Sequence, residues 1–178
     1  MTRVRGRRQR RTWQAVTAAI EVPEAGAAGV IAAHGGNFGG WSLYAHEGKL
    51  RYHYNFLGLM QFDVTSAGTL PAGAHQVRME FAYDGGGLGK GGTATLFLDG
   101  KPVGHGRVER THAFFFSMDE TMEIGCDVGE PVSPDYGPRG NAFTGTITWV
   151  QIDIDAASTD GDHLIGAEER FHLAMARQ

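Results

Sequence analysis

The sequence contains very little cysteine: Cys126 is the only one among 178 residues. A single cysteine excludes an internal disulfide and any cysteine-based metal cluster. No apolar run approaches the length of a membrane span, so we expect a soluble protein without a membrane partner. The apolar stretch after Arg10 and Arg11 is short and ends at Glu21, unlike an export signal, and we therefore expect a cytoplasmic location.

Signatures of common catalytic centres are also absent. The glycine-rich stretch from Asp84 to Gly92 lacks the spacing of a phosphate-binding loop, because Gly91 follows Lys90 where Ser or Thr is required. No H-E-x-x-H pattern and no G-x-S-x-G nucleophile elbow occurs. Glu80 and Asp84 have the spacing of a carboxylate pair on one strand, but Asp84 opens the glycine-rich stretch. Both are therefore expected to be solvent-facing charges.

Positive charge is concentrated at the start of the chain. Six arginines lie within residues 1–12 and no acidic residue occurs before Glu21, so the net charge of −4 conceals a basic leader and a more acidic body. A disordered, solvated leader accounts for this pattern, with binding to nucleic acid or another anionic surface as the alternative. The favoured interpretation includes no nucleic-acid partner.

Glycine and aromatic residues are abundant, with 27 Gly, 10 Phe, 5 Tyr and 3 Trp, which is the composition of a sandwich or barrel. Many short segments alternate apolar and polar residues, as half-buried strands do. Glu47-Gly48 and Asp99-Gly100 are tight-turn signals that join two pairs of these segments into hairpins. The predicted strands are residues 14–22, 29–34, 41–46, 50–56, 60–65, 75–83, 93–98, 101–110, 121–126 and 143–154.

This pattern predicts an all-β fold, an antiparallel two-sheet jelly-roll sandwich with one C-terminal helix. The helix is predicted from Gly166 to Arg177, because Glu168 and Glu169 lie in its first turn and an apolar stripe follows. The expected organisation is a basic leader (1–12), a β-sandwich domain (13–155), and a linker with the helix (156–178).

Three stretches of the chain resemble the C-terminal portion of large bacterial arylsulfatases. They are HGGNFGGWSLYAHEGKLRYHYNFLG (His34 to Gly58), FAYDGGGLGKGGTATLFLDGKPVGHGRVERT (Phe81 to Thr111) and DVGEPVSPDYGPRGNAFTGTI (Asp127 to Ile147). The final EERFHLAMARQ is similar to the end of those proteins, and the resemblance extends over nearly the whole chain after about residue 13. In that family the region looks like an accessory β-sandwich of the laminin-G or concanavalin A type, behind a separate catalytic α/β domain.

The resemblance also implies which chemistry is missing. Sulfatases of this family convert the Cys or Ser of a C/S-x-P-S/A-R motif to formylglycine, whereas Cys126 is followed by Asp-Val-Gly-Glu. We therefore expect no enzymatic activity and no catalytic residues. The resemblance implies a non-catalytic accessory domain, and we expect it to associate with a protein partner or with itself, through the C-terminal helix or a sheet edge. The alternative is a lectin-like module that binds sulfated or anionic glycans.

Acidic residues gather around the long polar loop of residues 127–141, which precedes the last predicted strand. Oxygen-rich loops at the rim of a sandwich hold Ca²⁺ when several carboxylates converge. The EF-hand spacing is missing, so a solvated or hydrogen-bonded loop is the alternative. The sequence predicts no cofactor other than this candidate structural calcium, with ligands Asp119, Glu120, Asp127 and Asp135.

The glycan alternative would need an exposed ring and exposed cations. Tyr44 alternates away from the apolar face of its strand and is the ring expected to be exposed, whereas Trp41, Tyr52 and Tyr54 lie on apolar faces and are expected in the core. The ligand-binding candidates are Tyr44, Arg51, Lys90 and Arg139.

Overall fold

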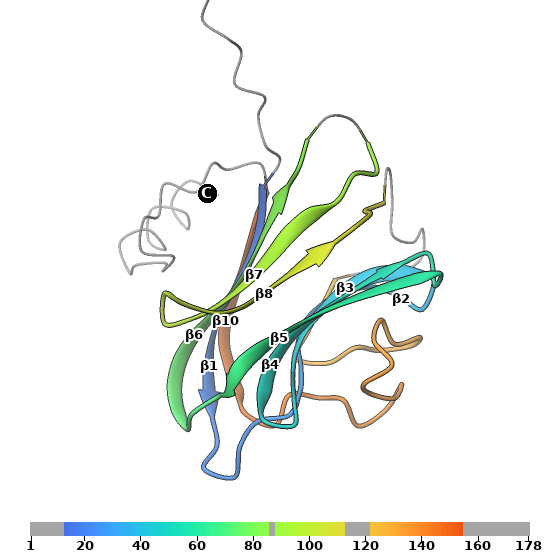
Figure 1. The fold of residues 1–178 in the computed structure, drawn as a ribbon. Coiled ribbons are helices and arrows are strands. Elements are labelled where there is room, and N and C mark those ends of the chain that lie inside the picture. Colours follow the sequence, from blue (N-terminus) through green and yellow to red (C-terminus); the bar gives the residue numbers. More distant parts are fainter. Residues whose placement is uncertain (1–12, 86–87, 113–121, 155–178) are drawn as a thin grey trace, which may run out of the picture.

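The computed structural model describes residues 13–85, 88–112 and 122–154. They form two five-stranded antiparallel sheets, sheet A with the order β10-β1-β6-β7-β8 and sheet B with the order β5-β4-β3-β2-β9 (Figure 1). None of the described residues forms a helix that could span a membrane. The strands are β1 Trp13–Val22, β2 Gly29–Gly36, β3 Gly39–His46, β4 Lys49–Phe56, β5 Met60–Thr69, β6 Gly73–Tyr83, β7 Gly92–Leu98, β8 Lys101–Val108, β9 Met122–Ile124 and β10 Thr146–Ile154.

Three hairpins turn through residue pairs in which both members have positive φ. The predicted pairs Glu47-Gly48 and Asp99-Gly100 have φ of 51° and 73°, and of 49° and 77°. Such turns match the right-handed twist of the strands that they join. The third pair, Leu57-Gly58 between β4 and β5, has φ of 57° and 67°, and the sequence pattern did not predict it.

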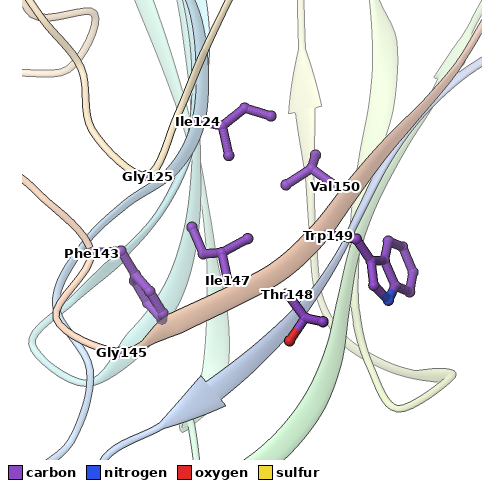
Figure 2. Close-up of a pocket in the computed structure, with 8 residues that line it drawn as sticks. All are labelled: Ile124, Gly125, Phe143, Gly145, Ile147, Thr148, Trp149 and Val150. Atoms are coloured by element: carbon purple, nitrogen blue, oxygen red, sulfur yellow. The ribbon is translucent and has the colours of Figure 1, made fainter.

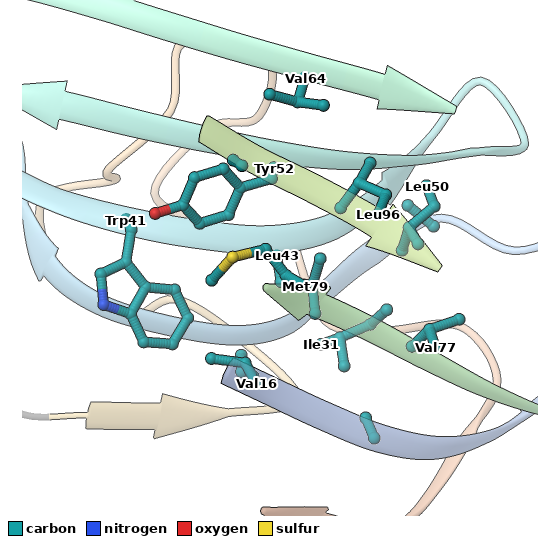
Figure 3. Close-up of a cluster of buried hydrophobic side chains, with 14 of the residues drawn as sticks. Val16, Ile31, Trp41, Leu43, Leu50, Tyr52, Val64, Val77, Met79 and Leu96 are labelled. Atoms are coloured by element: carbon teal, nitrogen blue, oxygen red, sulfur yellow. The ribbon is translucent and has the colours of Figure 1, made fainter. Parts of the chain in front are cut away.

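The core lies between the two sheets and is filled by the inward side chains of both (Figure 3). The aromatic residues expected there are buried, with Trp41 1%, Tyr52 2% and Tyr54 4% exposed. From sheet A, Val77 and Met79 are fully buried against them in the same cluster. Alternation along the strands therefore predicts the inward faces correctly.

The strands near the C-terminal end of the described chain are shorter than predicted. β9 contains only three residues, and β10 begins at Thr146 instead of residue 143. The residues before β10 bond to the connections around them, since Phe143 N–H donates to the Gly125 carbonyl (2.8 Å) and Thr144 N–H to the Ala28 carbonyl (2.8 Å). The C-terminal helix and the basic leader were predicted for residues outside the described ranges.

The expectation that Glu80 faces solvent is wrong. Glu80 is 9% exposed and accepts a hydrogen bond from Arg78 Nε (2.8 Å), and Arg78 Nη1 donates to Thr17 Oγ1 (3.1 Å). Pairing with Arg78 is what allows the carboxylate to be buried. Asp84 is exposed, as predicted, and pairs with Arg107.

Glycines close one long side of the sandwich, where β5 of sheet B meets β8 of sheet A. A Cβ at Gly104 would lie 2.6 Å from the Thr65 carbonyl oxygen, and one at Gly106 would lie 2.7 Å from a Val64 methyl group. The two strands approach this closely only because those positions carry no side chain.

Candidate functional site

The long polar loop that connects β9 to β10 folds onto the outer face of sheet B. Its base is closed by Asn141, whose Oδ1 accepts from the Asp127 N–H (3.0 Å) and whose Nδ2 donates to the carbonyls of Asp127 (2.7 Å) and Gly137 (2.9 Å). Val132, 1% exposed, packs with Val30, Ala33 and Tyr44 in a second small apolar cluster. The loop is therefore a packed part of the fold.

Asp127 organises the interior of this loop. Its carboxylate accepts from the Val132 N–H (3.0 Å) and from the Tyr136 hydroxyl (2.6 Å), and the Tyr136 hydroxyl also lies 2.8 Å from Ser42 Oγ on β3. Burial, together with the hydrogen bond to Asp127, raises the pKa of Tyr136 well above its usual value. The phenol thus stays protonated and links the loop to sheet B.

A second carboxylate, Asp135, fixes the middle of the loop to strands β3 and β4. Its Oδ2 accepts from the Tyr44 hydroxyl (2.6 Å) and from Arg51 Nη1 (2.8 Å), and Arg51 Nη2 bonds to Glu47 (3.0 Å). Burial alone would raise the pKa of Asp135, but the hydrogen bonds from Tyr44 and Arg51 outweigh it and hold the pKa below its usual value. The carboxylate is therefore ionised at neutral pH.

These contacts correct the expectation for Tyr44 and give no support to the calcium prediction. Tyr44 is fully buried, because the loop covers the face of β3 on which its ring lies. Asp127 is 2% exposed, and Asp127 and Asp135 bond to different donors of the protein itself. Asp119 and Glu120 lie outside the described residues. Within the described ranges, no three His, Cys, Asp or Glu side chains are grouped so that they could hold a metal ion.

The other ligand-binding candidates do not gather at one place with Tyr44. Arg51 is held between Asp135 and Glu47, with 22% of its side chain exposed. Lys90 and Arg139 are exposed, and the Lys90 N–H and carbonyl fix its connection by bonding to the Tyr83 hydroxyl (2.8 Å) and the Thr111 hydroxyl (2.7 Å). Of the four candidates, Lys90 and Arg139 are thus accessible to a ligand.

On the long side opposite β5 and β8, the described strands leave the sandwich open. A hollow of about 370 Å³ lies between β9 and β10, where Ile124 of β9 faces Ile147 and Val150 of β10 (Figure 2). Ile124 is 50% exposed, so the hollow opens to solvent. The remaining lining residues are Gly125, Phe143, Gly145, Thr148 and Trp149.

The turns between β2 and β3 and between β4 and β5 lie at the same end of sheet B (Figure 1). They carry exposed apolar side chains, which we call the turn-tip patch. It consists of Phe38 (71% exposed) on the β2–β3 turn, and of Leu57 (48%), Leu59 (79%) and Met60 (39%) at the β4–β5 turn. Sequence reasoning did not find it, although an apolar residue beside glycines at two turns, N-F-G-G and F-L-G-L, is a signal that could have done so.

One buried side chain holds the two turns of the patch together. Asn55, 1% exposed, donates through Nδ2 to the Asn37 carbonyl (3.0 Å) and accepts at Oδ1 from the Gly58 N–H (2.8 Å). The turns are also in contact, since a Cβ at Gly58 would lie 3.2 Å from the Asn37 oxygen. The patch is thus presented on a fixed support.

Comparisons with solved structures identify the fold. The chain is similar to domains LG4-5 of the mouse laminin α1 chain (TM-score 0.54, 18% identity), covering 83% of this chain and only 37% of that one. It is also similar to the CBM40 of the Ruminococcus gnavus IT-sialidase, alone (TM-score 0.52, 14% identity, 85% and 80% covered) and bound to α2,3-sialyllactose (0.50, 14%, 81% and 77%).

These likenesses show a jelly-roll sandwich of the laminin-G and concanavalin A type, as predicted, and at such identities they show the fold alone. No protein-family model matches the chain, and no curated protein matches its sequence.

Proposed function

We propose that this chain is a non-catalytic accessory domain that binds another protein through the turn-tip patch. The observation that carries the proposal is the exposure of Phe38 and Leu59 on two turns that Asn55 holds in place. Exposed apolar groups gathered on a fixed support are typical of protein-binding surfaces, because little conformational entropy is lost when a partner covers them.

The backbone at Leu57 adds to this argument. A leucine with positive φ is strained by roughly 1 kcal/mol, and Asn, Asp or Gly is the usual residue at that position of the turn. The chain thus keeps an apolar side chain, half exposed, where a polar one would fold more easily. Binding gives a physical reason for that choice.

The chemistry of the surrounding residues favours a protein partner over a membrane surface. Residues 34–42 and 55–62, which include both turns and the adjacent strand ends, contain no Lys, Arg, Asp or Glu. Segments that insert into anionic membranes usually place cations beside their apolar residues. An uncharged patch instead matches an apolar pocket of a protein.

The resemblance to arylsulfatases supplies the partner to be tested, a catalytic α/β domain of that class. The experiment measures binding of the full chain, by calorimetry, to a bacterial arylsulfatase catalytic domain prepared without its own C-terminal portion. We expect binding that the double variant F38N/L59N weakens at least about tenfold, because two apolar anchors are removed. The matched control is Leu88→Asn, which changes a leucine that is 68% exposed on the β6–β7 connection.

Leu57→Asn separates binding from folding. It should raise the free energy of unfolding by roughly 0.5 to 1 kcal/mol by relieving the strained turn, while weakening the complex. Absence of binding to the catalytic domain, or binding that the patch variants leave unchanged, would contradict the proposal. The chain alone should hydrolyse neither aryl sulfates nor glycosides, with or without Ca²⁺.

A second candidate function is binding of sulfated or anionic glycans, favoured by the exposed cations Lys90 and Arg139. Because Tyr44 is buried and Arg51 is engaged by Asp135, binding would have to rely on the other two side chains. The test is a glycan array at low salt that includes sialyllactose and sulfated oligosaccharides. A signal that is lost in Lys90→Ala and Arg139→Ala would support this function, and silence would contradict it.

A further inference from the structure

The sandwich has four edge strands, and three of them are protected against pairing with another chain. β5 and β8 cover each other where Gly104 and Gly106 allow close approach, and β8 also carries Pro102. β9 is only three residues long. Short strands, proline and coverage by a neighbouring element are the usual ways in which proteins prevent edge-to-edge association.

Within the described ranges, the fourth edge strand, β10, shows none of these features. Its nine residues, TITWVQIDI, contain no Pro, Gly, Lys or Arg, and they include five β-branched residues between positions 146 and 152. One of its edges pairs with β1, and no strand of the described ranges pairs with the other. A bulge interrupts the β1 pairing only near Thr148, and pairing is regular from Trp149 to Ile154.

We propose that β10 is a self-association strand, through which two copies of this chain pair. Antiparallel pairing of β10 with the β10 of a second copy would join the two A sheets into one continuous sheet about a two-fold axis. This inference does not depend on the proposed function, because the turn-tip patch belongs to sheet B and β10 is an edge of sheet A.

The side chains indicate a register centred on Gln151. In that register Val150 of one copy lies opposite Ile152 of the other. Both residues pack against the core on the inner side of the sheet and are only partly buried. Pairing would cover the apolar surface that remains exposed on them.

Charge favours the same register. Asp153 is the only charged residue of β10, and in this register it lies opposite Trp149 of the other copy. The two Asp153 carboxylates then lie roughly 13 Å apart along the strands, far enough that repulsion between them is largely screened. A register centred on Asp153 would instead place the two carboxylates side by side.

The hollow between β9 and β10 fits this arrangement. It is open at the same long side of the sandwich, and Ile124, Ile147 and Val150 line it (Figure 2). A second copy placed along β10 would shield this apolar lining from water. The edge therefore combines apolar surface with a strand edge that no described strand uses, and strand addition requires both.

The experiment is sedimentation velocity of the full chain over a range of concentrations, with substitutions at the proposed two-fold axis. We expect a monomer–dimer equilibrium with a Kd of about 10 µM, as for a small interface. Gln151→Lys and Gln151→Glu should each weaken dimerisation at least about tenfold, because each places two like charges opposite one another. An equimolar mixture of the two variants should dimerise again.

The control is Gln61→Lys, the same substitution at an exposed position of β5, which should leave the dimer unchanged. A second measurement needs no variant: amide hydrogen exchange of residues 146–154 should slow as protein concentration rises, while exchange of β5 stays constant. A monomer up to about 100 µM, or a mixture of the Lys and Glu variants that stays monomeric, would overturn the proposal. The double variant F38N/L59N should still dimerise when it no longer binds the arylsulfatase domain. The two proposals can therefore be tested separately.

Discussion

The two long sides of the sandwich differ in how closely the two sheets approach each other. On the β5–β8 side, Gly104 and Gly106 remove side chains so that strands of different sheets come into direct contact. On the β9–β10 side, a hollow of about 370 Å³ lies between the sheets, and Ile124, Ile147 and Val150 line it. The connection on that side folds outward onto sheet B and does not fill the hollow.

The difference shows which side of the sandwich has room for additional atoms. A side closed by backbone contact tolerates no added atoms, because packed backbone cannot move aside. On the open side, the connection between β9 and β10 is held to sheet B by side-chain hydrogen bonds, each of which contributes only about 1 kcal/mol. The hollow lies on the open side, and so does β10, whose second edge pairs with no described strand.

The largest effect is expected from Gly104→Val on the closed side. Its Cβ would lie 2.6 Å from the Thr65 carbonyl oxygen, so β5 and β8 would have to separate. We expect a loss of about 3 kcal/mol in the free energy of unfolding, measured by urea denaturation. Gly68→Ala on β5, where nothing lies within 4 Å of an added Cβ, should change stability by less than about 0.5 kcal/mol. Equal effects of the two substitutions would show that the close approach does not matter.

An intermediate effect is expected from Asp127→Ala on the open side. The substitution leaves the Val132 N–H without its buried acceptor and removes one of the two hydrogen-bond partners of the Tyr136 hydroxyl. We expect a loss of about 2 kcal/mol and faster proteolysis between residues 128 and 140. Glu130→Ala, at an exposed position of the same loop, is the control. A loop that stays resistant to protease after Asp127→Ala would be held mainly by its apolar contacts.

Local sequence patterns predicted the strands and their inward faces, but they did not predict which outward faces are exposed. Alternation placed Trp41 and Tyr52 in the core, and Asp99-Gly100 marked a hairpin, because these features depend on neighbours in the chain. The same alternation pointed Tyr44 outward correctly, yet it could not show that a loop 91 residues later covers that face. Long-range contacts of this kind leave no periodic signal.

Glu80 and the turn-tip patch illustrate the same limit. Glu80 alternates onto an outer face, yet it is buried there and its carboxylate is paired with Arg78. Leu57 stands at a turn position where Asn, Asp or Gly is usual, so turn rules alone did not predict the turn. Departures from local rules are expected where surfaces serve binding.

The smallest effect is expected from removing the charge of Asp135, which tests whether its ion pair with Arg51 helps to hold the loop on sheet B. The folded-state pKa of Asp135 lies below its usual value, so the unfolded chain binds more protons at this residue as the pH falls below about 5. Its contribution to stability is therefore complete at neutral pH and is lost as the pH falls through the folded-state pKa. The Arg51–Asp135 pair is partly exposed, with 22% and 26% of the side chains accessible, so we expect no more than about 1 kcal/mol.

Asp135→Asn should remove this contribution, so that the free energy of unfolding falls less steeply between about pH 5 and pH 3 than in the parent chain. The measurement is a series of urea titrations across that range, with Glu130→Gln as a control for the loss of one exposed acid in the same loop. Parallel pH profiles for the parent and Asp135→Asn would mean that the Arg51–Asp135 pair adds nothing measurable to stability and that the other contacts hold the loop. In that case the two sides of the sandwich would differ in how closely they pack, and this ion pair would not be part of the difference.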